Sequence, residues 1–168
     1  MGARDYHAAT PIIDGQMIIL SGQSVRALKI EKQDDAMAAK EQWSDSDVST
    51  SFNTPVLKED KVFGLTGQNA LFCIDAKSGK TLWTHDLSSG GGGRRGPGGF
   101  GSVIDAGPVL MALTPSAELT VFKPDPAEYS EVAKIKVADS PTYAYPAVAG
   151  NRIVIKDEQS VALYDLQE

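Results

Sequence analysis

The sequence predicts an all-β protein, and more specifically a β-propeller built from four-stranded antiparallel blades. Short apolar runs alternate with turn residues such as Asp-Gly and Ser-Gly, a pattern that is typical of strands and hairpins. A related segment also recurs along the chain, beginning at Met17, Val62, Leu110 and Arg152, so that the spacings are 45, 48 and 42 residues. Strand-rich repeats of roughly 40–50 residues are characteristic of propeller blades.

The repeats divide the 168 residues into one domain of about four blades, approximately residues 7–49, 50–89, 102–139 and 140–168. The second blade shows the complete pattern, with strands expected at Thr54–Lys58, Lys61–Thr66, Ala70–Asp75 and Thr81–His85. By the spacing of that blade, the last strand of the fourth blade would fall beyond Glu168. We therefore expect half of a larger propeller, with its last blade incomplete.

Two segments depart from the repeat. Asp34–Gln42 has a helix-forming composition but lies where the connection between the third and fourth strands of the first blade must be. We expect an enlarged hairpin there, and a helical turn within it remains an alternative. Ser88–Ser102 holds eight of the 16 glycines and lies between the second and third blades, so its composition predicts a flexible insertion on one face of the propeller.

Composition and charge exclude several classes of protein. A single cysteine rules out an intrachain disulfide, and no run of about 18 apolar residues predicts a transmembrane helix. The first residues also lack the apolar core of a signal peptide. Arg94, Arg95 and Phe100 could suggest an RGG-like contact with nucleic acid, but this pattern occurs once in a chain with a net charge of −6. We expect no nucleic-acid partner.

The segment Cys73–Trp83 (CIDAKSGKTLW) resembles the blade motif of the PQQ-like β-propeller repeat family, approximately A-x-D-x-x-[TS]-G-[KE]-x-x-W. The matching residues are Asp75, Ser78, Gly79, Lys80 and Trp83. The first blade carries a decayed version that closes with Trp43, and the fourth blade keeps Asp165. This resemblance implies kinship with BamB-like outer-membrane assembly lipoproteins and with quinoprotein alcohol dehydrogenases.

Several expectations follow from the resemblance alone. The motif tryptophans Trp43 and Trp83 would stack between blades, and Asp75 and Asp165 would accept hydrogen bonds in turns. Such propellers typically have eight blades, so this half would need another half. That half would come from a second copy in a homodimer or from the rest of a longer chain. The family also implies an extracytoplasmic location, in the periplasm of a bacterium.

The enzymes of this family hold pyrroloquinoline quinone (PQQ) with a vicinal cysteine disulfide and a Ca²⁺ ion. Here Cys73 stands alone in an apolar strand, which predicts an inert buried thiol. Ser44–Asp47 offers oxygen ligands but lacks the glycine and distal glutamate of an EF-hand loop. His85 and His7 are expected at strand ends without a nucleophile motif beside them. We therefore predict no catalytic residue and no metal site.

The function predicted from the sequence is a non-catalytic scaffold that binds a protein or a small ligand, without a cofactor. The alternative is half of a PQQ-dependent dehydrogenase whose quinone and Ca²⁺ are held largely by the other half. Phe100, Tyr143 and Tyr145 precede the first strands of the third and fourth blades, near the expected axial channel. The candidate contact residues are Arg94, Arg95, Phe100, Tyr143, Tyr145 and His7.

Overall fold

The computed structural model describes residues 8–87 and 100–166, which form antiparallel β-sheets that follow one another along the chain. The first sheet contains β1 (Ile12–Asp14), β2 (Met17–Ser21), β3 (Val25–Gln33) and β4 (Ala36–Asp45). The second contains β5 (Val56–Lys58), β6 (Lys61–Leu65), β7 (Ala70–Asp75) and β8 (Thr81–Asp86). The third contains β9 (Ser102–Asp105), β10 (Leu110–Leu113), β11 (Glu118–Phe122) and β12 (Glu131–Lys136). The fourth contains β13 (Ala147–Ala149), β14 (Arg152–Lys156) and β15 (Val161–Asp165).

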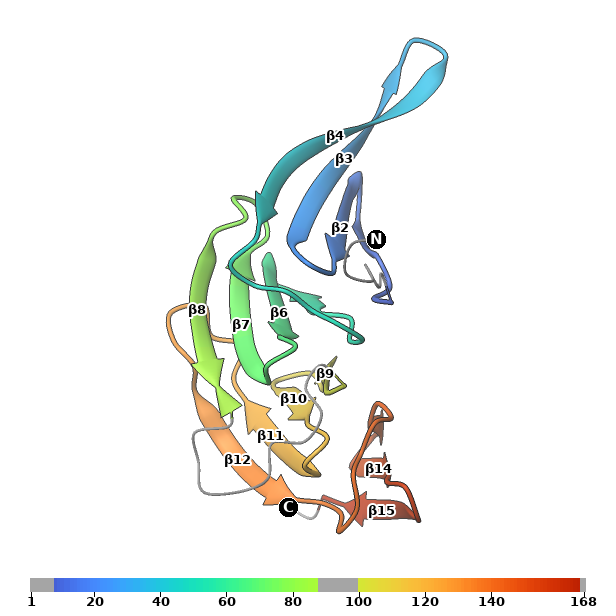
Figure 1. Ribbon diagram of the computed structural model, residues 1–168, viewed down its shortest axis with the longest axis vertical. Helices are drawn as coiled ribbons and strands as arrows, with labels where there is room; N and C mark the ends of the chain where they lie inside the picture. Colours follow the sequence, from blue (N-terminus) through green and yellow to red (C-terminus); the bar gives the residue numbers. More distant parts are fainter. Residues whose placement is uncertain (1–7, 88–99, 167–168) are drawn as a thin grey trace, which may run out of the picture.

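The four sheets are arranged as successive blades along an arc (Figure 1). Within each sheet the strands pair in chain order, and β4, β8 and β12 line the convex side of the arc. This architecture confirms the predicted all-β propeller of four-stranded blades, with a last blade that has three strands in the described part of the chain. No helix in the described residues is long and apolar enough to cross a membrane.

The enlarged hairpin of the first blade is formed entirely by strands. β3 and β4 pair from Val25 opposite Asp45 to Gln33 opposite Ala36, with one register shift between Ala27 and Leu28, and a two-residue turn at Asp34 and Asp35 joins them. The alternative of a helical turn in Asp34–Gln42 is therefore wrong. The cross-strand ladder overrides the helix-forming composition, because each residue from Ala36 to Glu41 pairs with a residue of β3.

The pairing register corrects the alignment of the repeats by one residue. Lys61 pairs with Asp75 as Arg152 pairs with Asp165, so Lys61 rather than Val62 is the equivalent of Arg152. The turn between the second and third strands is one residue shorter in the fourth blade, which a gap-free alignment cannot show. Both pairs are ion pairs, with nitrogen–oxygen distances of 3.2 Å for Lys61–Asp75 and 2.9 Å for Arg152–Asp165.

The core consists of apolar layers between neighbouring blades. Alternate residues of β7 point to opposite faces of the second sheet, as expected for a strand. Phe72 and Ile74 pack against the first blade, whereas Leu71 and Cys73 pack against the third, and all four side chains are fully buried. A third layer, which contains Leu113 and Ile155, joins the third and fourth blades. The second and third blades therefore each depend on both neighbouring blades to cover their two apolar faces.

Candidate functional site

One face of the arc collects the segments that connect successive blades. Because the strands of a blade run antiparallel, the linkers between blades lie at the same end as the turns between second and third strands. Backbone hydrogen bonds join the two sets: Thr50 N–H donates to Gly22 O, and Val137 N–H donates to Ala117 O, each at 2.8 Å. We call this end of the blades the linker face.

Three equivalent residues on the linker face form a chain of hydrogen bonds. Thr10, Thr54 and Tyr145 each precede a proline that immediately precedes the first strand of a blade. Thr10 N–H donates to Thr54 Oγ1 at 2.9 Å, and Thr54 N–H donates to the Tyr145 hydroxyl at 2.7 Å. Tyr145 is a contact residue proposed from the sequence, whereas Thr10 and Thr54 were missed. The Xaa-Pro pair before the first strands of the first, second and fourth blades was the signal that could have found them.

Aromatic rings from three different linkers meet beside these hydrogen bonds. The rings of Phe52 and Phe100 are stacked, with centroids 4.5 Å apart and planes at 12°. Tyr143 meets Phe100 edge to face, with centroids 5.8 Å apart. Together with Tyr145 they keep 38–44% of their surface exposed. We call these four residues the linker aromatics.

The structure thus brings Phe100 and Tyr143 into contact and joins Tyr145 to Thr54, and all three are contact residues proposed from the sequence. Phe52 was missed, although it stands two residues before Thr54 just as Tyr143 stands two residues before Tyr145. That repeated spacing could have identified it. His7, Arg94 and Arg95, and residues 88–99 of the glycine-rich insertion, lie outside the described residues.

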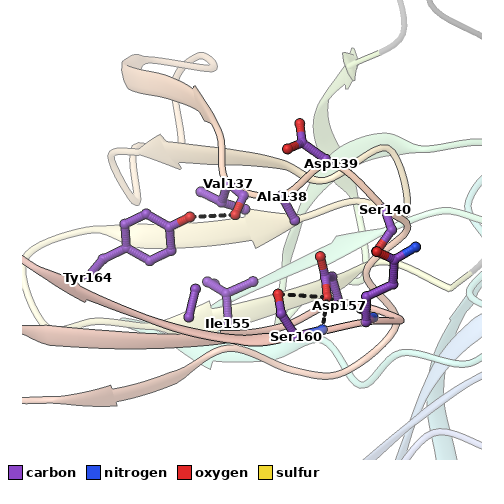
Figure 2. A pocket seen from close by; sticks show the side chains of 10 residues that line it. Val137, Ala138, Asp139, Ser140, Ile155, Asp157, Ser160 and Tyr164 are labelled. Carbon is purple, nitrogen blue, oxygen red and sulfur yellow. Dashed lines mark hydrogen bonds between the residues drawn. The ribbon is translucent and has the colours of Figure 1, made fainter.

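A cavity of about 300 Å³ lies on the same face, between the third and fourth blades (Figure 2). Val137–Ser140 of the linker line one side, and residues of β14, β15 and their turn line the other. The Asp157 carboxylate accepts hydrogen bonds from the backbone N–H groups of Ser160, at 2.5 Å, and Gln159, at 2.9 Å. These bonds, led by the one from Ser160, lower the pKa of Asp157 to about 2. Of the two carboxylates that line the cavity, Asp157 is therefore engaged in holding the β14–β15 turn, and Asp139 pairs with Lys136.

The motif residues of the second blade form the turn between β7 and β8. Asp75 accepts hydrogen bonds from Ser78 Oγ at 2.8 Å and from Ser78 N–H at 2.9 Å, and it pairs with Lys61. The hydrogen bonds from Ser78 are the main reason why the pKa of Asp75 falls to about 2. The backbone carbonyl of Lys80 accepts the Asp75 N–H at 2.9 Å, which closes the turn.

The two tryptophans contact the next blade along the arc. Trp43 Nε1–H donates to the carbonyl of Ala76 in the second blade, and Trp83 Nε1–H donates to that of Asp125 in the third, each at 2.9 Å. The two tryptophans have equivalent positions, since Trp43 pairs with Ala27 and Trp83 pairs with Cys73 on the third strand of their blades.

The third blade has no tryptophan at this position. Val121 of β11, the equivalent of Cys73, pairs with Ala133 of β12. Instead, the Tyr164 hydroxyl of the fourth blade donates to the carbonyl of Val137 at 2.5 Å, which joins the third and fourth blades close to the cavity. The cavity therefore lies at the junction that lacks an indole bridge.

The described residues do not fit a site for a quinone and a calcium ion. Cys73 is fully buried, and burial raises the pKa of its thiol to about 12, so this group is a poor nucleophile and a poor ligand. No group of three or more His, Cys, Asp or Glu residues in the described ranges could hold a metal ion. The His85 ring is stacked on Tyr129, with centroids 3.7 Å apart.

The arc of four-stranded blades and the motif of the second blade define a propeller of PQQ-like repeats. The family model described as outer membrane protein assembly factor BamB matches residues 6–124 and 40–167. The chain therefore belongs to this BamB-like family, as the sequence motif predicted. No curated protein matches the sequence.

Solved structures share the fold at low sequence identity. BamB from Moraxella catarrhalis is 16% identical with a TM-score of 0.70, over 99% of this chain and 48% of that one. The computationally designed Ika4 protein is 7% identical with a TM-score of 0.69, over 99% of this chain and 94% of that one. A europium-containing methanol dehydrogenase is 14% identical with a TM-score of 0.56, over 79% of this chain and 25% of that one. This chain thus spans about half the length of the Moraxella BamB structure.

Proposed function

We propose that this chain is a non-catalytic propeller scaffold that forms one half of an eight-bladed ring and binds a partner protein outside the cytoplasm. One observation carries the proposal. The first and fourth blades, at the two ends of the arc, each expose an apolar sheet face. The equivalent faces of the inner blades are covered by a neighbouring blade. A BamB-like scaffold of this kind would present its linker face to a partner.

The outer face of the fourth blade is apolar and uncovered. Val161 and Leu163 of β15 are 66% and 57% exposed. Their equivalents in the second blade, Leu71 and Cys73, are fully buried against the third blade. The outer edge of β15 also lacks a strand partner in the described residues, whereas β7 pairs with β8. This face is suited to the attachment of another blade.

The outer face of the first blade is the counterpart. Ile13 of β1 is 73% exposed, and Ile18 and Leu28 on the next two strands are only half-buried. The equivalents of Ile18 and Leu28 in the second blade are Val62 and Ile74, which are fully buried against the first blade. The outer face of the first blade therefore resembles the face of the second blade that packs against the first blade.

The blade junctions within the chain join these same two kinds of face. We propose that a second copy covers them, with the fourth blade of each copy packed on the first blade of the other. Two identical contacts then close a ring with twofold symmetry. The Ika4 structure, which this chain covers over 94% of its length, shares the fold in a polypeptide of similar length.

The oligomeric state of the purified chain tests ring closure. Light scattering should give twice the mass of 17.9 kDa, and Leu163→Asp should shift the mass toward that of one chain. Val132→Asp is the matched control, because Val132 is 53% exposed, close to Leu163, but lies on β12 of the third blade, which has a neighbouring blade on each side. A wild-type chain that remains monomeric at high concentration would contradict the proposal.

The non-catalytic part of the proposal has a separate test. Purified protein mixed with PQQ and Ca²⁺ should show no absorbance of bound quinone after gel filtration. It should also not reduce an artificial electron acceptor in the presence of alcohols or sugars. Retained quinone with alcohol-dependent reduction would favour the dehydrogenase alternative, whatever the oligomeric state.

A further inference from the structure

We propose that the linker aromatics bind an extended, proline-rich segment of the partner protein. This inference names the partner chemistry of the proposed scaffold and rests on its binding function. It does not depend on whether a second copy closes the ring.

The rings already form a platform. Phe52 and Phe100 stack at 4.5 Å, and Tyr143 meets Phe100 at 5.8 Å, so three linkers contribute to one continuous aromatic surface. The other aromatic cluster, at the junction of the second and third blades, differs because Phe122 is fully buried and Trp83 and Tyr129 pack against the core. The linker aromatics therefore have ring surface to offer to a ligand.

The platform also carries hydrogen-bond donors. The Tyr145 hydroxyl accepts the Thr54 N–H, which leaves its own proton for an acceptor on a ligand. The Tyr143 hydroxyl has no hydrogen-bond partner among the described residues. A polyproline II segment has no internal hydrogen bonds, so its backbone carbonyls are free to accept from these hydroxyls. Docking of such segments on aromatic-lined surfaces is a general mode of peptide recognition.

Within the described ranges, the segments that carry the rings are uncharged. Residues 50–55 (TSFNTP), 100–101 (FG) and 140–146 (SPTYAYP) contain no Asp, Glu, Lys or Arg. The carboxylates nearest to them in sequence are Asp47 and Asp139, and Asp139 already pairs with Lys136 at 3.3 Å. A neutral peptide matches this surface better than an acidic or basic one, because a charged group would lose hydration without gaining a partner.

Fluorescence anisotropy with a labelled decaproline peptide tests the inference on the whole chain. We expect saturable binding to the wild type and no binding of a labelled Gly-Ser decapeptide. Phe100→Ala and Tyr143→Ala should each weaken decaproline binding at least tenfold. Tyr143→Phe, which keeps the ring, should weaken it less. Val132→Ala is the matched control because Val132 is exposed on β12, away from the linker face, and its binding should equal that of the wild type.

Three results would overturn the inference: no saturable binding of decaproline, equal binding by the alanine variants, or tighter binding of a decaarginine peptide than of decaproline. Circular dichroism of each variant shows whether it is folded, and the Tyr143 pair provides a test if Phe100→Ala is not. The mass of each sample, measured in parallel, separates this inference from ring closure. A monomer that binds decaproline contradicts only the ring, and a dimer that does not bind it contradicts only the peptide site.

Discussion

The indole ring of Trp43 lies directly on the α-carbon of Gly79 in the next blade. A Cβ atom at Gly79 would be 2.5 Å from Cδ2 of the indole, far inside van der Waals contact. Gly79 also has a φ of +73°, in the left-handed region that favours glycine. The indole N–H donates to the carbonyl of Ala76 in the same turn. The junction between the first and second blades therefore requires glycine at this position for two independent reasons.

The first prediction is that Gly79→Ala lowers the free energy of unfolding by about 2–5 kcal/mol. The left-handed backbone accounts for roughly 1–2 kcal/mol of this loss, and the clash with the indole accounts for about 1–3 kcal/mol. Urea denaturation followed by far-ultraviolet circular dichroism measures the change. Gly150→Ala is the control, since Gly150 has a φ of +60° but no neighbouring atom within 4 Å of a Cβ. Equal losses in the two variants would show that the Trp43 contact contributes nothing.

The sequence motif contains Gly79 and Trp83, but it does not reveal which residues touch. Repeats establish that positions in different blades are equivalent, because each blade solves the same local problem of turns and strand pairing. The contact between Trp43 and Gly79 joins the end of one blade to a turn of the next. It depends on how blades stack, which no local pattern of residues specifies.

The linker face shows a second kind of contact that could not be predicted from the sequence. Tyr143, Tyr145 and Phe100 could be identified as candidates from their place before the first strands. Their partners Phe52 and Thr54 lie about 50 to 90 residues away, and only the curvature of the arc brings them together. By contrast, the span of β7 could be predicted to the residue, because its apolar run and flanking turns are local signals.

The second prediction concerns Tyr145 and Thr54. Tyr145→Phe removes the acceptor of the Thr54 N–H and should lower the free energy of unfolding by about 0.5–1.5 kcal/mol. The amide of Thr54 should also exchange with deuterium faster than in the wild type, as measured by NMR. Tyr143→Phe serves as the control, because Tyr143 accepts no backbone N–H in the described structure. If the Thr54 amide exchanges equally fast in wild type and Tyr145→Phe, this hydrogen bond does not hold the blades together.

The third prediction concerns the pH dependence of stability. Hydrogen bonds from Ser78, supported by Lys61, lower the pKa of Asp75 from 3.8 to about 2 in the folded protein. Its ionised form therefore stabilises the fold above about pH 4, and this contribution is lost as the pH falls toward 2. Asp75→Asn should cost about 1 kcal/mol at pH 7, allowing for solvent screening. The difference from wild type should shrink below pH 4.

Urea denaturation of wild type and Asp75→Asn at several pH values between 2 and 7 measures this effect. Glu128→Gln is the control, since Glu128 is exposed in the loop between β11 and β12 and should change stability little at any pH. A constant difference between wild type and Asp75→Asn down to pH 2 would mean that the charge of Asp75 does not contribute.

The fourth prediction is that Cys73 is unreactive in the folded protein. Its side chain is fully buried between the second and third blades, and burial raises its pKa to about 12, so almost no thiolate forms at pH 8. Modification by a chromogenic disulfide reagent should therefore occur only at the rate at which the junction opens. It should become rapid and stoichiometric in concentrated urea, and the single cysteine of the chain makes the readout unambiguous.

Cys73→Ala should abolish the signal in both conditions. Cys73→Ser should destabilise the fold more than Cys73→Ala, because it buries a hydroxyl that costs about 1–3 kcal/mol when it finds no partner. Rapid modification of the folded protein would show that the second and third blades separate readily, and the arc would then not be a rigid scaffold.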